Sequence, residues 1–156
     1  MRWACIVALV FLATCQQPAP TDVTVRTDAP LLGQRIQLPD GIESARWSVV
    51  PLGAVGGLAP GPTDTRLYAY LQPHLAAAAS LTSMASDQQP TAAAVPPDIA
   101  SLLIPADTLA TLQSDAAGDL LLPGQRYDPR AFDRGSYHGV FAVQLGDGVL
   151  VCLQTS

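Results

Sequence analysis

Two histidines, His74 and His138, are the residues of this sequence best suited to acid–base catalysis near neutral pH. Serine and aspartate are plentiful, so either histidine could in principle join a Ser–His–Asp arrangement. However, no serine lies in a G-x-S-x-G pattern, which would expose a nucleophilic serine between a strand and a helix. We therefore expect His74 to begin a helix after Pro73. A small periplasmic hydrolase that uses His138 or His74 is kept as the alternative function.

Metal and phosphate chemistry lack a recognisable motif. The sequence contains no H-x-x-x-H, no C-x-x-C and no D-x-D-x-D-G pattern, so we expect no metal site. The glycine-rich stretch 53–61 lacks the G-K-[ST] ending of a phosphate loop. Glycosidases need two carboxylic acids in one cleft, and Glu43 is the only glutamate among scattered aspartates, so no pair can be selected. We expect no cofactor.

The densest polar stretch is "GQRYDPRAFDRGSYHG" at residues 124–139. Its candidate binding residues are Arg126, Arg130, Arg134, Tyr137 and His138. The simplest interpretation is a local loop in which Asp128 and Asp133 neutralise neighbouring arginines, while Tyr127 and Phe132 pin it to the core. A second is a contact surface for a protein or glycan, since arginine and aromatic residues are enriched at binding hot spots. A third is an active site that uses His138.

Composition limits the classes of partner. The chain has 156 residues, enough for one domain, and a formal net charge of −5. All eight basic residues are arginine, which excludes lysine chemistry such as a Schiff base. Because no basic footprint is present, we expect no nucleic-acid partner.

The amino terminus has the pattern of an export signal. Met1-Arg2 supplies a positive charge, and residues 3–13 are nearly all apolar. Eleven residues of helix rise about 16 Å, which is too short for roughly 30 Å of hydrocarbon. This length instead suits the apolar region of a signal peptide.

The end of the apolar run, "LATC", resembles the lipobox of bacterial lipoproteins. The resemblance covers residues 1–15 and implies that residues 1–14 are a signal peptide and that Cys15 is lipidated, which would attach the chain to a membrane. Two or three acyl chains would make that anchor stable. It also implies a location in the bacterial cell envelope facing the periplasm, and Gln16 after the cysteine favours the outer membrane. With Cys5 removed and Cys15 lipidated, Cys152 remains alone and no disulfide is expected.

Behind the lipidated cysteine, residues 15–30 are polar and proline-rich and are predicted to form a tether. Residues 31–156 are predicted to form a single α+β domain: a small antiparallel sheet of about five strands, one or two short helices and a C-terminal β-hairpin. Strand signals occur at 35–38, 45–52 and 66–72. A Gly/Pro-rich loop at 53–62 and an Ala/Pro-rich segment at 74–97 interrupt the pattern.

Three finer expectations concern the side chains. In the alternating strand, Leu67, Ala69 and Leu71 should face the core, while the tyrosines cover a partly wet surface. A helix should end near Ile104, and a second should begin at Pro105. In the hairpin, a three-residue loop should pair Leu145 with Val149, Val143 with Val151 and Phe141 with Leu153, placing every large apolar residue on one face and Cys152 opposite Ala142.

The sequence therefore predicts a lipid-anchored envelope protein. The first functional hypothesis is a non-catalytic binding or accessory component of an envelope assembly, with a protein partner in the envelope.

Overall fold

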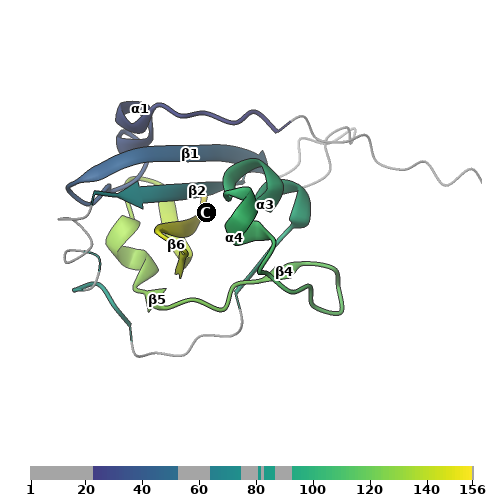
Figure 1. The fold of residues 1–156 in the computed structure, drawn as a ribbon. Coiled ribbons are helices and arrows are strands. Elements are labelled where there is room, and N and C mark those ends of the chain that lie inside the picture. The colour runs from purple at the N-terminus through teal and green to yellow at the C-terminus, as the bar shows by residue number, and fades with distance from the viewer. Residues whose placement is uncertain (1–22, 53–63, 75–80, 82, 87–92, 156) are drawn as a thin grey trace, which may run out of the picture.

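The structure, a computed structural model, describes residues 23–52, 64–74, 81, 83–86 and 93–155. Its centre is an antiparallel sheet of five strands in the order β1-β2-β7-β6-β5 (Figure 1). The strands are β1 (Ile42–Pro51), β2 (Thr65–Pro73), β5 (Arg126–Tyr127), β6 (Tyr137–Leu145) and β7 (Gly148–Thr155). The predicted α+β class, with a sheet of about five strands, few short helices and a C-terminal hairpin, is confirmed.

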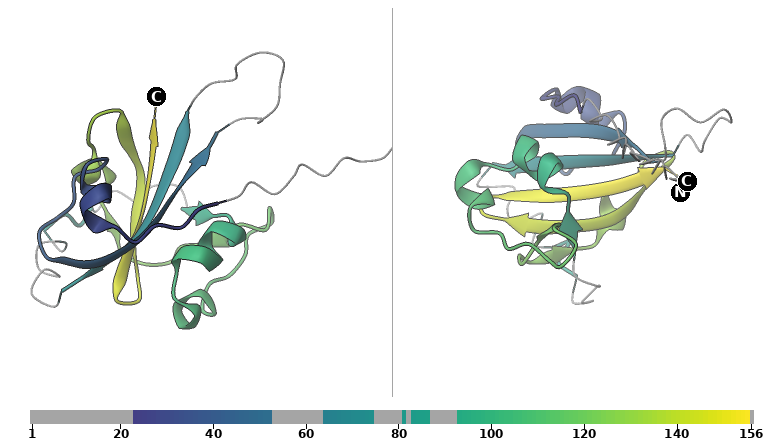
Figure 2. Two further views of the ribbon diagram at one scale, coloured as in Figure 1. Left: turned by 90° about the horizontal axis from the view of Figure 1, so that it is seen from above. Right: turned by 90° about the vertical axis from the view of Figure 1, so that its right-hand side faces the viewer.

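Short elements lie on both faces of this sheet. They are α1 (Ala29–Gly33), α3 (Pro97–Leu103), α4 (Ala106–Leu109), the 3-10 helix η2 (Pro129–Phe132), and a two-stranded sheet of β3 (Ala94–Val95) and β4 (Leu120–Leu121). Figure 2 shows α1 on one face of the sheet and α3 with α4 on the other. The sheet is therefore the middle layer of the fold, with an apolar cluster on each side.

Strand β2 shows why two clusters form. Leu67, Ala69 and Leu71 point into the cluster under α1, as predicted from the alternation. The expectation that the tyrosines cover a partly wet surface is wrong, because Tyr68 and Tyr70 are 3% and 2% exposed. They lie in the second cluster with residues of α3, so this face is also a core.

The predicted hairpin register is wrong for the same reason. Leu145 pairs with Gly148 across a two-residue turn at 146–147, which sets Val143 opposite Leu150. Gly146 has a φ of +56°, and this left-handed conformation suits a tight hairpin turn. The prediction of a three-residue loop assumes that all large apolar residues share one face, but residues 148–153 are buried on both faces. Cys152 consequently lies opposite Phe141 and not Ala142.

The described part of the predicted tether contacts the sheet. Arg26 and Trp47 exchange two backbone hydrogen bonds of 2.8 and 2.9 Å, and the Arg26 guanidinium lies 5.4 Å from the Trp47 ring centre. Val23 and Val25 pack against the cluster under α3. The predicted strand at 35–38 is absent: α1 precedes it, and Ile36 is buried outside any strand.

Proline sets the helix boundaries around residue 105, as predicted to within one residue. Helix α3 ends at Leu103, and Pro105, with a φ of −55°, is the residue that precedes α4. The predicted signal peptide, Cys15, the loop 53–62 and much of the segment 74–97 lie outside the described residues. Within the described part of the chain, no helix is long and apolar enough to cross a membrane.

Candidate functional site

Arg134 and Tyr137, two of the predicted binding residues, are engaged within the fold. The Arg134 guanidinium donates a hydrogen bond to the backbone carbonyl of Gly33 at the end of α1. Tyr137 is buried, and its hydroxyl lies 3.2 Å from the Thr65 hydroxyl. These two side chains therefore join the 134–137 turn to α1 and β2.

Arg126 and Arg130 differ in their surroundings. One terminal nitrogen of Arg126 donates to the Leu122 carbonyl at 3.1 Å, whereas the other, Nη1, is buried and has no hydrogen-bond partner among the described residues. Desolvation lowers the pKa of Arg126, since burial disfavours its charged form. Arg130 is exposed, and its backbone N–H donates to the Asp128 carboxylate at 3.0 Å.

Asp128 and Asp133 are predicted to form ion pairs with neighbouring arginines, but the described residues show neither carboxylate paired with an arginine. Asp128 caps the backbone of η2. Asp133 accepts a 2.6 Å hydrogen bond from the Gly139 N–H, and its second oxygen lies 3.6 Å from Nδ1 of His138. Both carboxylates therefore shape the loop, while Phe132 is fully buried and pins it to the core as expected.

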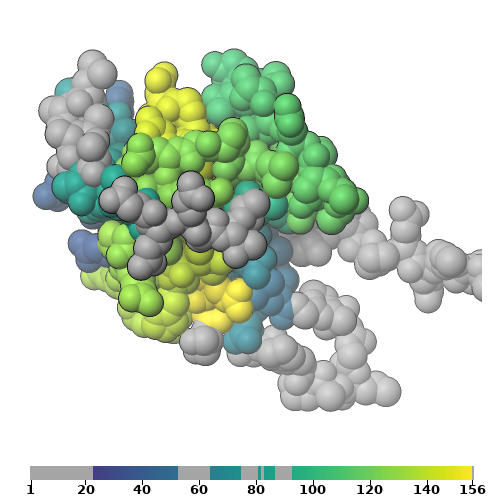
Figure 3. Space-filling view, turned by 90° about the horizontal axis from the view of Figure 1, so that it is seen from below, coloured from purple at the N-terminus to yellow at the C-terminus, as the bar shows by residue number. Residues whose placement is uncertain are grey.

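A groove of about 540 Å³ lies where β5 ends and β6 continues past it. We call it the edge groove; the residues that define it here are Ala85, Arg126, Pro129, Arg130, Val140 and Phe141. Figure 3 views the molecule from below Figure 1, the side on which the connection from β4 to β5 (green) crosses the surface. The groove forms because β5 has two residues and β6 has nine.

Val140 gives the edge groove its apolar character. The pairing of β6 with β7 shifts register between Gly139 and Phe141, so Val140 is the extra residue of a bulge. Val140 is 47% exposed, and among the described residues it is the one large hydrophobic residue that is exposed. The groove thus combines an exposed apolar side chain with Arg126 and Arg130.

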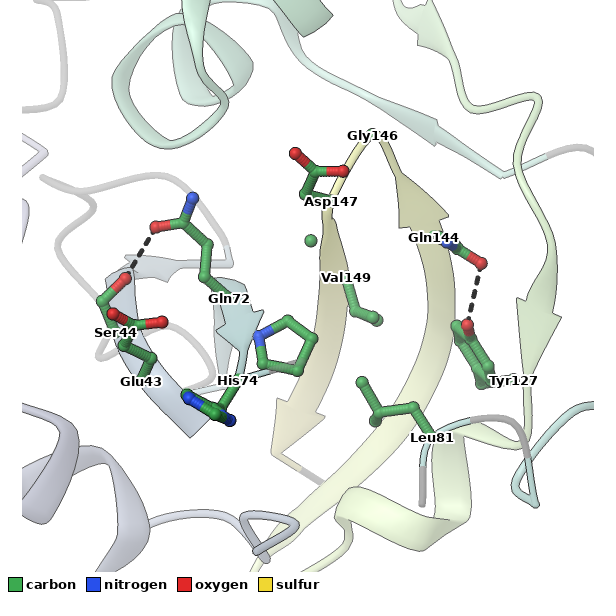
Figure 4. Close-up of a pocket in the computed structure, with 12 residues that line it drawn as sticks. Glu43, Ser44, Gln72, His74, Leu81, Tyr127, Gln144, Gly146, Asp147 and Val149 are labelled. Atoms are coloured by element: carbon green, nitrogen blue, oxygen red, sulfur yellow. Dashed lines mark hydrogen bonds between the residues drawn. The ribbon is translucent and has the colours of Figure 1, made fainter. Parts of the chain in front are cut away.

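A second cavity, of about 630 Å³, lies at the end of the sheet where β6 turns into β7, and it shares Tyr127 with the lining of the edge groove. We call it the end pocket; its lining includes Glu43, Ser44, Gln72, Pro73, His74, Leu81, Tyr127, Gln144, Asp147 and Val149 (Figure 4). Strands β1, β2, β6 and β7 all contribute to it. No motif in the sequence links Glu43 with Asp147; the antiparallel pairing of the strands brings both residues to this pocket.

Two hydrogen bonds orient amide side chains in the end pocket. The Ser44 hydroxyl donates to Oε1 of Gln72 at 2.7 Å. The Tyr127 hydroxyl donates to Oε1 of Gln144 at 3.0 Å. Figure 4 shows the Ser44–Gln72 pair beside β1 and β2 and the Tyr127–Gln144 pair beside β6. Gln72 lies on the face of β2 that carries Tyr70, whereas Gln144 lies on the opposite face with its pairing partner Val149.

The two histidines are not equivalent as candidate catalytic residues. His74 lines the end pocket together with Ser44, but the Ser44 hydroxyl donates to an amide oxygen, which cannot act as a general base. His138 has an exposed side chain beside Asp133.

Among the residues that the structure describes, no group of three or more His, Cys, Asp or Glu could hold a metal ion. In comparisons with known proteins, no family model, curated protein or solved structure matches this chain.

Proposed function

We propose that this protein is a lipid-anchored component of the bacterial cell envelope, held by Cys15 to the periplasmic side of the outer membrane, and that it binds a partner protein there without catalysis. The observation that carries the binding role is the exposed Val140 at the edge groove, flanked by Arg126 and Arg130. An apolar side chain framed by arginine is typical of binding hot spots.

The chemistry of the edge groove favours an acidic partner segment with an apolar side chain. Arg126 is partly desolvated, and its Nη1 has no acceptor within the described structure. A carboxylate from a partner would supply that acceptor if the guanidinium turned toward it, and charge-assisted hydrogen bonds of this kind are the stronger ones. Arg130, which is exposed, would add attraction at the rim.

The lipid anchor is tested by labelling cells with a fatty acid. Cys15→Ala should abolish incorporation of the label, because the thiol that carries the acyl group is gone. Cys5→Ala is the matched control and should label like wild type, since residue 5 precedes the proposed cleavage point. Undiminished labelling of Cys15→Ala would show that the chain is not a lipoprotein of this type.

The partner is tested by cross-linking in intact cells, followed by affinity capture and mass spectrometry. We expect a protein that is captured by wild type and lost in Val140→Asp and in the double variant Arg126→Ala/Arg130→Ala. Gln113→Ala, an exposed position outside the edge groove, should capture it normally. Capture of the same proteins by all four chains would contradict binding through this groove.

A hydrolase remains the second candidate because His74, Ser44 and Glu43 line one pocket. Catalysis would require the Ser44 hydroxyl to leave Gln72 and donate to a base. An ester-hydrolysis assay with 4-nitrophenyl acetate discriminates between the two functions. We expect no turnover above background, whereas turnover that Ser44→Ala and His74→Ala both abolish would establish the hydrolase.

A further inference from the structure

We propose that the domain lies with α1 and the β1 edge of its sheet against an anionic membrane surface, where Arg26 and Arg35 bind lipid phosphate groups. This inference deepens the proposed lipid anchoring at Cys15 and rests on it. The anchor supplies the attachment to the membrane, so the charges of the domain need only orient it.

Two guanidinium groups lie beside one aromatic ring at the β1 edge. The guanidinium carbons of Arg26 and Arg35 are 5.4 and 5.8 Å from the centre of the Trp47 ring. Both arginines are exposed, and within the described residues neither forms an ion pair. A guanidinium beside an aromatic ring keeps its N–H groups in a planar fork, which fits phosphate oxygens. The pair is therefore positioned to bind phosphate groups on a surface that the β1 edge approaches.

The layers on the two faces of the sheet differ in charge. Residues 93–123, which form β3, α3, α4 and β4, contain no basic residue and four aspartates: Asp98, Asp107, Asp115 and Asp119. Residues 23–40, which include α1, contain two arginines and two aspartates, and the exposed Arg134 adds a positive charge at the end of α1. An anionic surface repels the first layer and not the second. Because α1 lies on one face of the sheet and α3 with α4 on the other, the charges turn α1 toward such a surface (Figure 2).

The path of the chain keeps the β1 edge close to the anchor. The segment before α1 runs along β1, where Arg26 and Trp47 exchange backbone hydrogen bonds (Figure 1). Val23, the first residue that the structure describes, comes eight residues after Cys15. Eight residues of any chain span at most about 29 Å, so the edge stays within reach of the lipid headgroups. A weak contact is sufficient at this range, because the anchor makes it intramolecular.

The test is fluorescence quenching by a lipid that carries a nitroxide on its headgroup. With residues 1–14 removed, Trp47 is the one tryptophan of the chain. The acylated chain is reconstituted into vesicles of phosphatidylcholine, with or without phosphatidylglycerol, and each signal is divided by that from vesicles without nitroxide. We expect quenching to be about twice as strong with phosphatidylglycerol and to decrease when salt screens the contact.

Three variants isolate the contribution of the two arginines. Arg26→Gln/Arg35→Gln should reduce quenching to its level in phosphatidylcholine alone, whereas Arg26→Lys/Arg35→Lys should retain most of it, because lysine keeps the charge. Arg46→Gln is the matched control and should be quenched like wild type. It removes an exposed arginine from the opposite face of β1, where the guanidinium donates to the Leu102 carbonyl of α3.

Flotation of the vesicles separates this inference from the proposed function. A chain that floats with neither kind of vesicle overturns the lipid anchor and the orientation together. A chain that floats but is quenched equally in both kinds of vesicle overturns the orientation alone, as does a folded Arg26→Gln/Arg35→Gln protein that is quenched like wild type. Val140→Asp should be quenched like wild type even where it loses the protein partner, because the edge groove lies at β5, the opposite edge of the sheet.

Discussion

Tyr70 on β2 donates a hydrogen bond from its hydroxyl to the backbone carbonyl of Leu145, at 2.9 Å, in the buried interior. β7 lies between these two strands, so the phenol reaches across it to the end of β6. The path is open because residue 148 is glycine: a Cβ there would collide with the Tyr70 ring. One side chain therefore fixes the hairpin end that borders the end pocket.

Tyr70→Phe should lower the free energy of unfolding by about 1–3 kcal/mol, because the Leu145 carbonyl would be left buried without its donor. The measurement is urea denaturation followed by circular dichroism. A change within about 0.5 kcal/mol would show that water or the backbone replaces the phenol.

Gly148→Ala should cost about 1–3 kcal/mol through overpacking against Tyr70. Gly33→Ala is the control, since its Cβ would meet the tip of Leu38 at an ordinary 3.4 Å. Equal stability of the two variants in thermal unfolding would contradict the close approach.

The two-sided core predicts that truncations on either face of β7 are costly. Leu150 lies in the cluster under α3 and Leu153 in the cluster under α1. Each Leu→Ala change should cost about 2–5 kcal/mol, whereas Val140→Ala should cost less than about 0.5 kcal/mol. A small effect of Leu150→Ala, with a large effect of Leu153→Ala, would indicate that only the face under α1 is a buried core.

The hairpin shows where inference from sequence stops. Alternation in β2 correctly separated Leu67 from Tyr68, because the period of two is a property of the strand itself. Whether the second face is wet depends on α3, whose position against the sheet no local pattern encodes. The register predicted for β6 and β7 assumes that the second face is wet, and the observed pairing shows that this register is wrong.

The candidate sites show the same division between local and tertiary information. The composition identifies the polar stretch that borders the edge groove. It does not show that the Arg134 guanidinium donates a hydrogen bond to the backbone carbonyl of Gly33, a residue far away in the sequence. The end pocket had no sequence signal at all, because Glu43 and Asp147 meet only through strand pairing.

Alkaline pH should destabilise the fold through Cys152. Burial raises the pKa of this thiol from 9.0 to about 12, so the unfolded chain ionises first as the pH rises. The stability associated with the neutral thiol is complete below pH 9 and is lost between pH 9 and about 12, at up to about 1.4 kcal/mol per pH unit.

Cys152→Ala is the comparison for that pH dependence. Tyr70 and Tyr127 also have pKa values raised by burial, and they lower the stability of both proteins at high pH. Burial raises the pKa of Tyr68 as well, and the Cys152 thiolate raises it further, so the difference between the two proteins includes this coupling, which acts in the same direction. Unfolding free energies measured by urea titration from pH 8 to 11.5 should therefore fall more steeply for wild type. Parallel curves would show that the Cys152 thiol is not shielded as the structure indicates.

The most direct test of the central claim places a photo-crosslinking amino acid at Val140 in living cells. Residue 130 serves as a second position in the edge groove, and residue 113 as an exposed position outside it. Binding through the groove predicts that illumination gives the same discrete protein adduct from residues 140 and 130 and none from residue 113. Absence of an adduct at residue 140, or an identical adduct at all three positions, would contradict the proposal that this protein engages a partner through the edge groove.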